Sequence, residues 1–324
     1  MSSISLKDIL EANERIKGSI KRTPVLNNDY INKLIDKKVY FKCENFQETG
    51  SFKSRGALNA VRKSIEKNGN CQGFITHSSG NHGTALSWAA MMENKKCIVV
   101  VPENAPSEKK KMIERYNAEI ILCKSTMKDR ERCCEDIKNI SGYKMIDPHN
   151  EYDVMAGQGS IGIEIDEEVP NCDAVLVAVG GGGLVSGVAT YFKESNKSVK
   201  IYCVEVIGKN LQESVDAKER LWDEDCQLLD TIADGIRVIK VGDKCFSPLL
   251  KYCEKEILTV TDDEIKNAMT MIYEELKIVI EPTGAVTLAA LLKYKDTVLK
   301  DLKNVSLIVC GGNISTSDIA NIFK

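Results

Sequence analysis

The sequence lacks the features of a membrane or secreted protein. No apolar run approaches the roughly 18 residues that a spanning helix needs, and charged residues interrupt positions 1–20, where a signal peptide would have an apolar core. A formal net charge of −3 leaves no basic surplus for nucleic acid. We therefore expect a cytoplasmic protein with neither a membrane nor a nucleic acid as its partner.

Patterns typical of metal sites and disulfide frameworks are also missing. The 12 cysteines include no CxxC pair, and the three histidines, His77, His82 and His149, do not have the spacing of zinc ligands. Several cysteines, such as Cys97 and Cys203, lie inside apolar runs. We predict reduced and mostly buried thiols, with neither disulfides nor a zinc site.

Short apolar runs rich in β-branched residues alternate with amphipathic stretches. Such runs are typical of parallel strands buried on both faces, so we predict an α/β fold. The expected strands are residues 39–43, 73–77, 97–102, 119–123, 174–179, 201–206 and 306–312. The 324 residues suffice for about two domains, and the 7 prolines are too scattered to mark a linker.

The segment 261–276 predicts one helix in detail. Thr261 and Glu264 have the spacing of a capping box. Apolar residues then share one face, at Ile265, Ala268, Met269, Ile272 and Leu276. We expect this helix to be structural.

A run of four glycines follows the expected strand at 174–179 and precedes a predicted helix. The run is Gly180, Gly181, Gly182 and Gly183. A backbone without side chains can approach an anion closely, and a helix N-terminus adds partial positive charge. We predict a phosphate site here, with a flexible turn as the alternative. The run matches neither GxGxxG nor GxxxxGK[ST], so the pattern does not favour a dinucleotide or Walker-type site.

The motif "SSGNHG" at 78–83 follows another expected strand and precedes an apolar helix. Polar residues at the carboxyl end of a strand line ligand clefts in α/β folds. Ser78, Ser79 and Asn81 can each donate and accept hydrogen bonds. His82 is either a catalytic residue or a satisfied hydrogen bonder in a turn.

Lys53 lies among small residues in "GSFKSRGA", just before a predicted helix. A lysine in a desolvated pocket loses part of its preference for the charged form and becomes a usable nucleophile. A nucleophilic lysine together with a phosphate site indicates a cofactor that carries both an aldehyde and a phosphate. Pyridoxal 5′-phosphate (PLP) has both groups.

Motifs along nearly the whole chain resemble those of fold-type II PLP enzymes, in the branch of serine racemase and the serine/threonine dehydratases. They are "RTPVL", "GSFKSRGA", "SSGNHG", "VMAGQGS", "VGGGGL", "TIADG", "EPTGAV" and "CGGN". The resemblance implies a large twisted-sheet domain (1–74 and 151–324), a smaller mobile domain (75–150), a cofactor cleft between them and a homodimer. The cysteine-synthase branch, with "SVKDR" and "TSGNTG", is a poorer match.

The resemblance also implies roles for individual cofactor-binding residues. Lys53 would form the Schiff base and act as a base on one face of the substrate. Phe52 would pack near the ring, Asn81 would bond its phenolic oxygen, and 180–183 would hold the phosphate. Cys310 would lie beside the ring nitrogen, where many relatives have a serine. A neutral partner leaves that nitrogen largely unprotonated and the ring a weaker electron sink.

For the substrate, the resemblance implies that Ser78, Ser79, His82 and Arg130 surround the carboxylate. From the sequence alone, an ordinary exposed charge is the favoured interpretation of Arg130, because exposed arginine is the usual case. In racemase-like members the serine matching Ser79 is the acid/base on the face opposite the lysine, whereas many threonine dehydratases have alanine there. Dehydratases of 3-hydroxyaspartate also have this serine.

We therefore predict a serine racemase that also eliminates water from L-serine, and from L-threonine as a further substrate, to yield a keto acid and ammonia. Racemisation and elimination share the first proton abstraction. One alternative is a dehydratase of threonine or 3-hydroxyaspartate without a physiological racemase role. Another is a PLP-binding protein without catalytic activity.

Metal binding stays open on the sequence. Racemase relatives hold Mg²⁺ or Ca²⁺ with a carboxylate, a backbone carbonyl and a second carboxylate, since these ions prefer oxygen ligands. Glu205 matches the first ligand and the carbonyl of Lys209 the second, but Leu211 occupies the third position. Glu213 is a substitute with the wrong spacing.

Overall fold

The computed structural model describes residues 3–69, 71–78, 80–223 and 226–323. Its strands are β1 (Val25–Leu26), β2 (Lys38–Cys43), β3 (Gly73–His77), β4 (Lys96–Pro102), β5 (Glu119–Cys123), β6 (Lys144–Met145), β7 (Ala174–Ala178), β8 (Lys200–Val206), β9 (Leu258–Val260) and β10 (Asn304–Val309). Among the described residues, no helix is both long and apolar enough to cross a membrane.

Helices connect most of these strands. They are α1 (Leu6–Ile16), α2 (Asp29–Ile35), α3 (Lys53–Asn68), α4 (Asn81–Met92), α5 (Ser107–Glu114), α6 (Met127–Ser141), α7 (Tyr152–Glu168), α8 (Gly183–Glu194), α9 (Leu211–Ala217), α10 (Asp243–Tyr252), α11 (Asp262–Met271), α12 (Pro282–Tyr294) and α13 (Thr316–Ile322). The short turns are η1 (Glu44–Phe46), η2 (Asp234–Ile236) and η3 (Ile272–Leu276).

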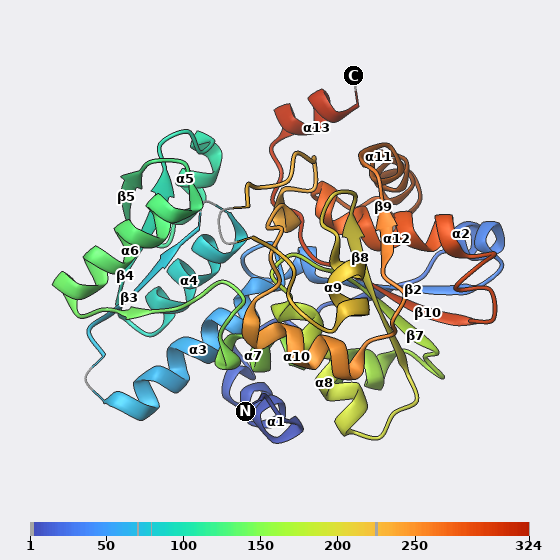
Figure 1. Cartoon of the computed structure of the whole chain (residues 1–324), viewed down its shortest axis with the longest axis horizontal. Coiled ribbons are helices and arrows are strands. Elements are labelled where there is room, and N and C mark those ends of the chain that lie inside the picture. The colour runs from blue at the N-terminus through green and yellow to red at the C-terminus, as the bar shows by residue number, and fades with distance from the viewer. Residues whose placement is uncertain (1–2, 70, 79, 224–225, 324) are drawn as a thin grey trace.

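A six-stranded sheet in the order β1-β2-β10-β7-β8-β9 forms the larger part of the molecule. Its strands are parallel except β1, which pairs antiparallel with β2. Leu176 of β7 packs in a core with α11 and α12, whereas its neighbours Val175 and Val177 pack in a second core with α7, α8 and α10. Figure 1 shows these helices on opposite sides of the sheet. Burial on both faces explains the continuous apolar runs.

A second, four-stranded parallel sheet has the order β5-β4-β3-β6. Residues of α4 and α5 pack on one of its faces, and Cys134 of α6 packs against Ile75 and Ile98 on the other. In Figure 1 this sheet and its helices lie apart from the larger sheet, on the left of the view. The predicted α/β fold is therefore confirmed.

The expected strands are all present, with small shifts at their ends. The largest shift is in β10, which ends at Val309 because the following Gly311 and Gly312 belong to the loop beyond the strand. The capping box is also confirmed, since Thr261 and Glu264 exchange side-chain-to-backbone bonds at the start of α11. This helix ends earlier than expected, at Met271, and continues as a π-helical turn. The wider turn leaves Leu276 only half-buried.

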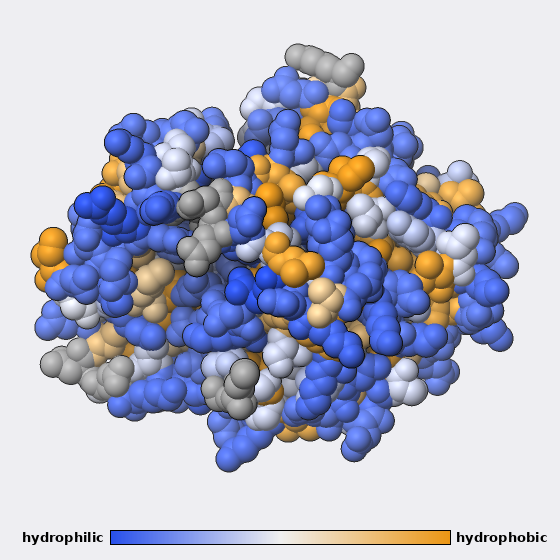
Figure 2. All heavy atoms as spheres, in the orientation of Figure 1, coloured by the Kyte–Doolittle hydropathy of each residue, from blue (hydrophilic) through white to orange (hydrophobic). Residues whose placement is uncertain are grey.

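Hydrophilic residues cover most of the face drawn in Figure 2, and hydrophobic side chains gather there only in small groups. Most apolar residues of the expected strands lie instead in the cores of the two sheets, with Leu122 of β5 as an exception at 52% exposed. Cys97 and Cys203 are among them, and the structure contains both as free, buried thiols.

Candidate active site

A cavity of about 660 Å³ lies at the carboxyl ends of strands from both sheets. It is lined by residues that directly follow β3 and β7, and by Cys310, which directly follows β10. This is the edge at which parallel α/β sheets bind ligands, and the volume is in the range of small-molecule sites.

The cavity brings together most of the site residues predicted from the sequence. Those that line it are Phe52, Lys53, Ser78, Asn81, His82, Arg130, Gly180, Gly181, Gly182, Gly183 and Cys310. Ser79 lies outside the described residues. Because these residues line the same cavity, they can contact the same ligand. Their individual roles remain predictions.

Lys53 is the first residue of α3, and its position depends on the strand end beside it. The N–H of Phe52 donates to the carbonyl of Cys310 (3.1 Å), and Ser51 pairs with Gly311 as an isolated β-bridge. The Lys53 amine donates to the carbonyl of Pro148 at 2.7 Å. Burial lowers the pKa of this amine to about 8, and the nearby charge of Asp147, which raises the pKa, has a smaller effect. The unprotonated, nucleophilic form is therefore accessible near neutral pH.

The glycine run connects β7 to α8 in a conformation that side chains would disrupt. Gly182 has φ +93°, which L-residues rarely adopt. A Cβ on Gly181 would lie 2.1 Å from the ring of His149, and one on Gly183 would lie 2.9 Å from the carbonyl of His149. Helix α8 begins at Gly183, so its N-terminal N–H groups are directed to this loop. The loop therefore fits a phosphate group.

Asn81, the first residue of α4, is held by two partners from the far end of the chain. Its side-chain N–H donates to Glu281 (2.7 Å), and its carbonyl accepts from Asn313 (2.8 Å). An amide has two N–H groups, so one donor is still available for the predicted contact with the cofactor's phenolic oxygen.

Burial, and secondarily the charge of Asp234, raises the pKa of Glu281 to about 8. A carboxyl group whose pKa is higher in the folded state contributes stability that is present below its unfolded value and is lost as pH rises through about 8. We compare the free energy of unfolding of the wild-type apoprotein with that of Glu281→Gln. As pH rises from about 5 to 8, we expect the wild type to become less stable relative to the variant, by at most about 1.4 kcal/mol per pH unit. Urea unfolding at several pH values measures this difference. A pH-independent difference between the two proteins would contradict the shift.

His82 is buried, and of its two ring nitrogens Nε2 has a hydrogen-bond partner among the described residues whereas Nδ1 has none. Its Nε2 lies 3.3 Å from the carbonyl of Ile146, which can only accept, so this nitrogen carries the proton. Burial, and next the charge of Lys53, lower the pKa of His82 to about 3. The ring is therefore neutral at pH 7. The implied contact between His82 and a substrate carboxylate remains a prediction.

Arg130 is half-buried, and its guanidinium reaches the cavity from α6. It donates from Nε and Nη2 to the carbonyl of Ser125 (3.1 and 2.8 Å). Burial, and to a smaller extent the charge of Arg237, lower its pKa. Two guanidinium groups thus face the same cavity, where an anionic ligand would relieve their repulsion.

The Cys310 thiol is buried, and burial together with the Glu281 charge raises its pKa well above the ordinary value. Cys310 is therefore a neutral thiol. This fits the implied neutral partner for a pyridine nitrogen.

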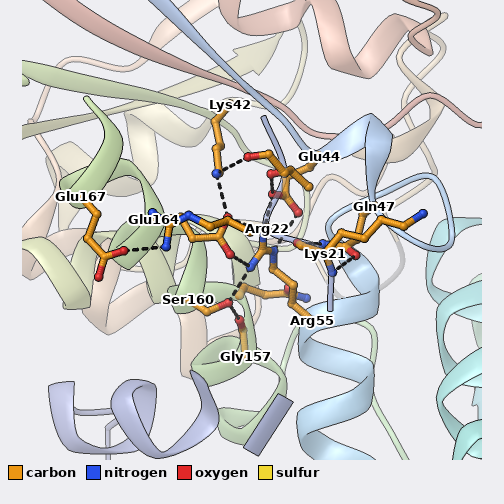
Figure 3. A network of polar contacts seen from close by, with 12 residues as sticks. Lys21, Arg22, Lys42, Glu44, Gln47, Arg55, Gly157, Ser160, Glu164 and Glu167 are labelled. Carbon is orange, nitrogen blue, oxygen red and sulfur yellow. Dashed lines mark hydrogen bonds and ion pairs between the residues drawn. The ribbon is translucent and has the colours of Figure 1, made fainter. Parts of the chain in front are cut away.

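A buried ionic network fixes the first turn of α3, two residues beyond Lys53. Arg55 binds two carboxylates through paired contacts: Glu44 (2.8 and 2.8 Å) and Glu164 of α7 (2.6 and 2.9 Å). Lys42 of β2 binds Glu164 as well, at 2.7 Å. Figure 3 shows these side chains converging from η1, α3, α7 and β2. Burial alone would lower the pKa of Arg55, but the two carboxylates raise it by more. The guanidinium therefore stays charged.

The predicted metal ligands do not converge on an ion. The Glu205 carboxylate accepts hydrogen bonds from the Leu211 N–H (3.1 Å) and the Thr259 hydroxyl (3.3 Å). The Lys209 carbonyl accepts from the indole N–H of Trp222 (2.8 Å), and the Leu211 side chain is buried. In the part of the chain that the structure describes, no three His, Cys, Asp or Glu residues form a group that could hold a metal. These residues do not fit a divalent cation.

Several residues of the cavity were not predicted individually. They are His149, Lys109, Asp234 and Glu281. Lys109 of α5 forms an ion pair with Asp234, which joins the smaller sheet's side of the cavity to the larger one. The motifs "TIADG" and "EPTGAV" contain two of these residues, but their partners lie more than a hundred positions away, so spacing could not reveal the pairs.

One cavity at the carboxyl ends of the two sheets' strands contains a lysine with a lowered pKa, a glycine loop that leads into a helix, and a neutral thiol. This combination is that of a PLP-dependent enzyme of fold type II. The family model described as "Pyridoxal-phosphate dependent enzyme" matches residues 16–311. The chain belongs to this family, and PLP is its cofactor.

The chain is similar over its whole length to racemases and dehydratases. It is 43% identical over 329 residues to serine racemase of Dictyostelium discoideum, covering 100% of this chain and 99% of that protein. It is 38% identical over 312 residues to β-hydroxyaspartate dehydratase of Paracoccus denitrificans (strain Pd 1222), covering 95% and 96%. The crystal structure of a PLP-dependent aspartate racemase matches with a TM-score of 0.95 at 40% identity, covering 98% of each chain.

These similarities show an enzyme of the racemase and ammonia-lyase kind that acts on a small amino acid. They favour an enzyme over the alternative of a PLP-binding protein without catalytic activity.

Proposed function

We propose that the enzyme racemises serine and also converts L-serine, with L-threonine as a further substrate, to a keto acid and ammonia. The observation that carries the proposal is the half-buried Lys53, whose amine has its pKa lowered to about 8 in the cavity that also contains the glycine loop and Cys310. The similarity to serine racemase of Dictyostelium discoideum supports serine as the substrate.

When bound, PLP draws electrons from the Cα of an attached amino acid and so makes its proton acidic. The Lys53 amine accepts that proton on one face. Ser79 is the proposed acid/base on the opposite face, and a proton returned from there inverts Cα. If the β-hydroxyl leaves first, the product is a keto acid and ammonia. Both outcomes require the same first proton transfer, so both activities depend on Lys53.

A second candidate is a dehydratase whose substrate carries an additional carboxylate, such as 3-hydroxyaspartate. Arg237 favours it, because this residue lines the cavity within electrostatic reach of Arg130. One guanidinium could then bind the α-carboxylate and the other the β-carboxylate. The similarity to β-hydroxyaspartate dehydratase supports the same candidate.

Chiral analysis of products distinguishes the two candidates. Purified enzyme is incubated with L- and D-serine, L-threonine, L-aspartate and 3-hydroxyaspartate, and both enantiomers and keto acid are measured. Formation of D-serine from L-serine together with keto acid supports the main proposal. Keto acid from 3-hydroxyaspartate without any D-serine from L-serine would replace it by the second candidate.

The variant Ser79→Ala tests the proposed two-face mechanism. We expect racemisation to fall by about 100-fold or more, whereas elimination of L-serine should fall by less than about 5-fold, because only racemisation needs the second proton donor. Ser64→Ala, in α3 and outside the cavity lining, is the matched control and should change neither rate. Equal losses of both activities in Ser79→Ala would reject the mechanism.

We also propose that residues 75–150 form a mobile domain that closes over the substrate, as the family resemblance implies. The Lys109–Asp234 pair joins the two sides of the cavity and would stabilise the closed form.

We further propose that the protein is a homodimer and that it is located in the cytoplasm. The 12 free cysteines fit the cytoplasm because it is a reducing compartment. Analytical ultracentrifugation measures the oligomeric state.

A further inference from the structure

The motif "CGGN" ends at Asn313, a residue to which the sequence analysis assigned no role. Asn313 is half-buried in the loop beyond β10 and is not part of the cavity lining. Its side-chain nitrogen donates two hydrogen bonds, to the backbone carbonyl of Thr49 (2.8 Å) and to the side-chain carbonyl of Asn81 (2.8 Å). Asn313 therefore connects the loop that precedes Lys53 to a predicted cofactor ligand.

The Thr49 carbonyl determines the orientation of both amides. A backbone carbonyl can only accept a hydrogen bond, so the Asn313 side chain must direct its nitrogen, and not its oxygen, to Thr49. The second N–H of that nitrogen donates to Asn81, whose amide must then present its oxygen to Asn313. The Asn81 nitrogen is thereby turned to Glu281, to which it donates (2.7 Å), and it retains one N–H for the predicted contact with the cofactor.

Glu281 cannot fix this orientation by itself. With its pKa raised to about 8, its carboxyl group is mostly protonated at pH 7, and a protonated carboxyl donates as well as accepts. Such a group can pair with either end of the Asn81 amide. In a reversed amide, however, the oxygen would face the phenolic oxygen of the cofactor, which also accepts hydrogen bonds. Reversal would therefore replace a hydrogen bond by repulsion.

The packing around Asn313 holds its amide against the loop that contains Thr49. Gly50 has φ +74°, and a Cβ on it would lie 2.2 Å from the Asn313 side-chain oxygen, so only glycine leaves room for this side chain. The N–H of Gly312 also donates to the carbonyl of Gly50 (2.9 Å), which joins the two loops next to Asn313. The orientation of Asn81 thus depends on backbone groups outside the cavity.

We propose that Asn313 is a positioning residue that fixes which end of the Asn81 amide faces PLP, with the Thr49 carbonyl as its reference. Through Asn81, it tunes both the affinity for PLP and the protonation of the phenolic oxygen, without contacting the cofactor or the substrate. The proposal rests on the predicted contact between Asn81 and that oxygen, and it does not depend on which amino acid the enzyme acts on.

The variant Asn313→Asp keeps the shape of the side chain but has no N–H to donate, so the Asn81 amide should reverse and donate to the new carboxylate. We expect PLP affinity to fall by at least about 10-fold. The visible absorbance band of the bound cofactor should also change, because it depends on the protonation of the phenolic oxygen. Asn313→Ala removes the donor without reversing Asn81 and should lower the affinity less. Titration of the apoprotein with PLP measures these values, and wild-type affinity and spectrum in both variants would overturn the proposal.

A double-mutant cycle with Asn81→Ala separates orientation from charge and packing. This variant removes the amide through which Asn313 acts, and should itself lower PLP affinity. In its background, neither Asn313 variant should lower the affinity by more than about 2-fold further. Additive losses would show that the substitutions act directly, by charge or by packing, and would overturn the proposal. Wild-type affinity and spectrum in Asn81→Ala would overturn it as well, since there would be no contact to orient.

Asn27→Asp is the matched control, because Asn27 has a similar pair of contacts outside the cavity lining. Its side-chain nitrogen donates to the carbonyl of Val39 (2.8 Å), and its oxygen accepts from the side chain of Asn32 (2.9 Å). This variant should lower the unfolding midpoint of the apoprotein, yet leave the spectrum unchanged and PLP affinity within about 2-fold of wild type. A loss of PLP affinity equal to that of Asn313→Asp would attribute the effect to stability alone and overturn the proposal.

Discussion

Replacing Lys53 with alanine is expected to abolish both racemisation and elimination, with rates reduced by at least about 10³-fold. The amine is the only group proposed both to bind the cofactor covalently and to accept the Cα proton. Its partial burial and its lowered pKa make it suited to both roles. Initial rates of D-serine and keto-acid formation from L-serine measure the loss.

A second readout separates a lost amine from a lost fold. Borohydride reduction of the wild-type holoenzyme should attach the cofactor permanently to the peptide that contains Lys53, as mass spectrometry can detect, and Lys53→Ala should show no attachment. Lys67→Ala, at the exposed end of the same helix, is the control and should behave as wild type. Turnover by Lys53→Ala above about 1% of wild type would refute the assignment of Lys53.

Replacing Arg55 with methionine is expected to lower the free energy of unfolding by about 3–5 kcal/mol, because it leaves the buried Glu44 carboxylate without a counter-ion and Glu164 with Lys42 as its remaining one. Arg55 is 1% exposed and makes paired contacts to Glu44 and Glu164 (Figure 3). Urea unfolding of the apoprotein measures the change. Since Arg55 lies in the first turn of the helix that begins at Lys53, we also expect weaker cofactor binding.

Arg22 provides the matched control for Arg55. It also pairs with two glutamates, Glu167 and Glu168, at the edge of the same network, but its side chain is 52% exposed. Exposed ion pairs contribute little, so Arg22→Met should cost less than about 1 kcal/mol. Similar losses for the two variants would show that burial does not govern the strength of this network.

Local patterns predicted the elements with long, regular signals. The run "GFITH" became β3, and the capping box at Thr261 began α11, because strand burial and helix capping depend on neighbouring residues. Strands β1 and β9 were not predicted, since two or three residues are too few to show a period. Their pairing is decided by the neighbouring strands β2 and β8.

For the site, the motifs identified the residues with special chemistry but not their partners. Lys53, the glycine run and Cys310 were predicted and line one cavity. The contacts of Asn81 with Glu281, and of Lys109 with Asp234, join residues distant in the sequence. No local pattern encodes such contacts, because they form only when the two sheets pack together.

The sequence by itself determined the α/β class and the cofactor and predicted the nucleophilic lysine, because residue type and short spacing carry that information. Only the tertiary structure decided the protonation and the neighbours of the site: which amine is desolvated, which carboxyl retains its proton, and which distant residues hold Asn81. These properties depend on burial and on charges brought together across long chain distances, and burial is a property of the folded chain.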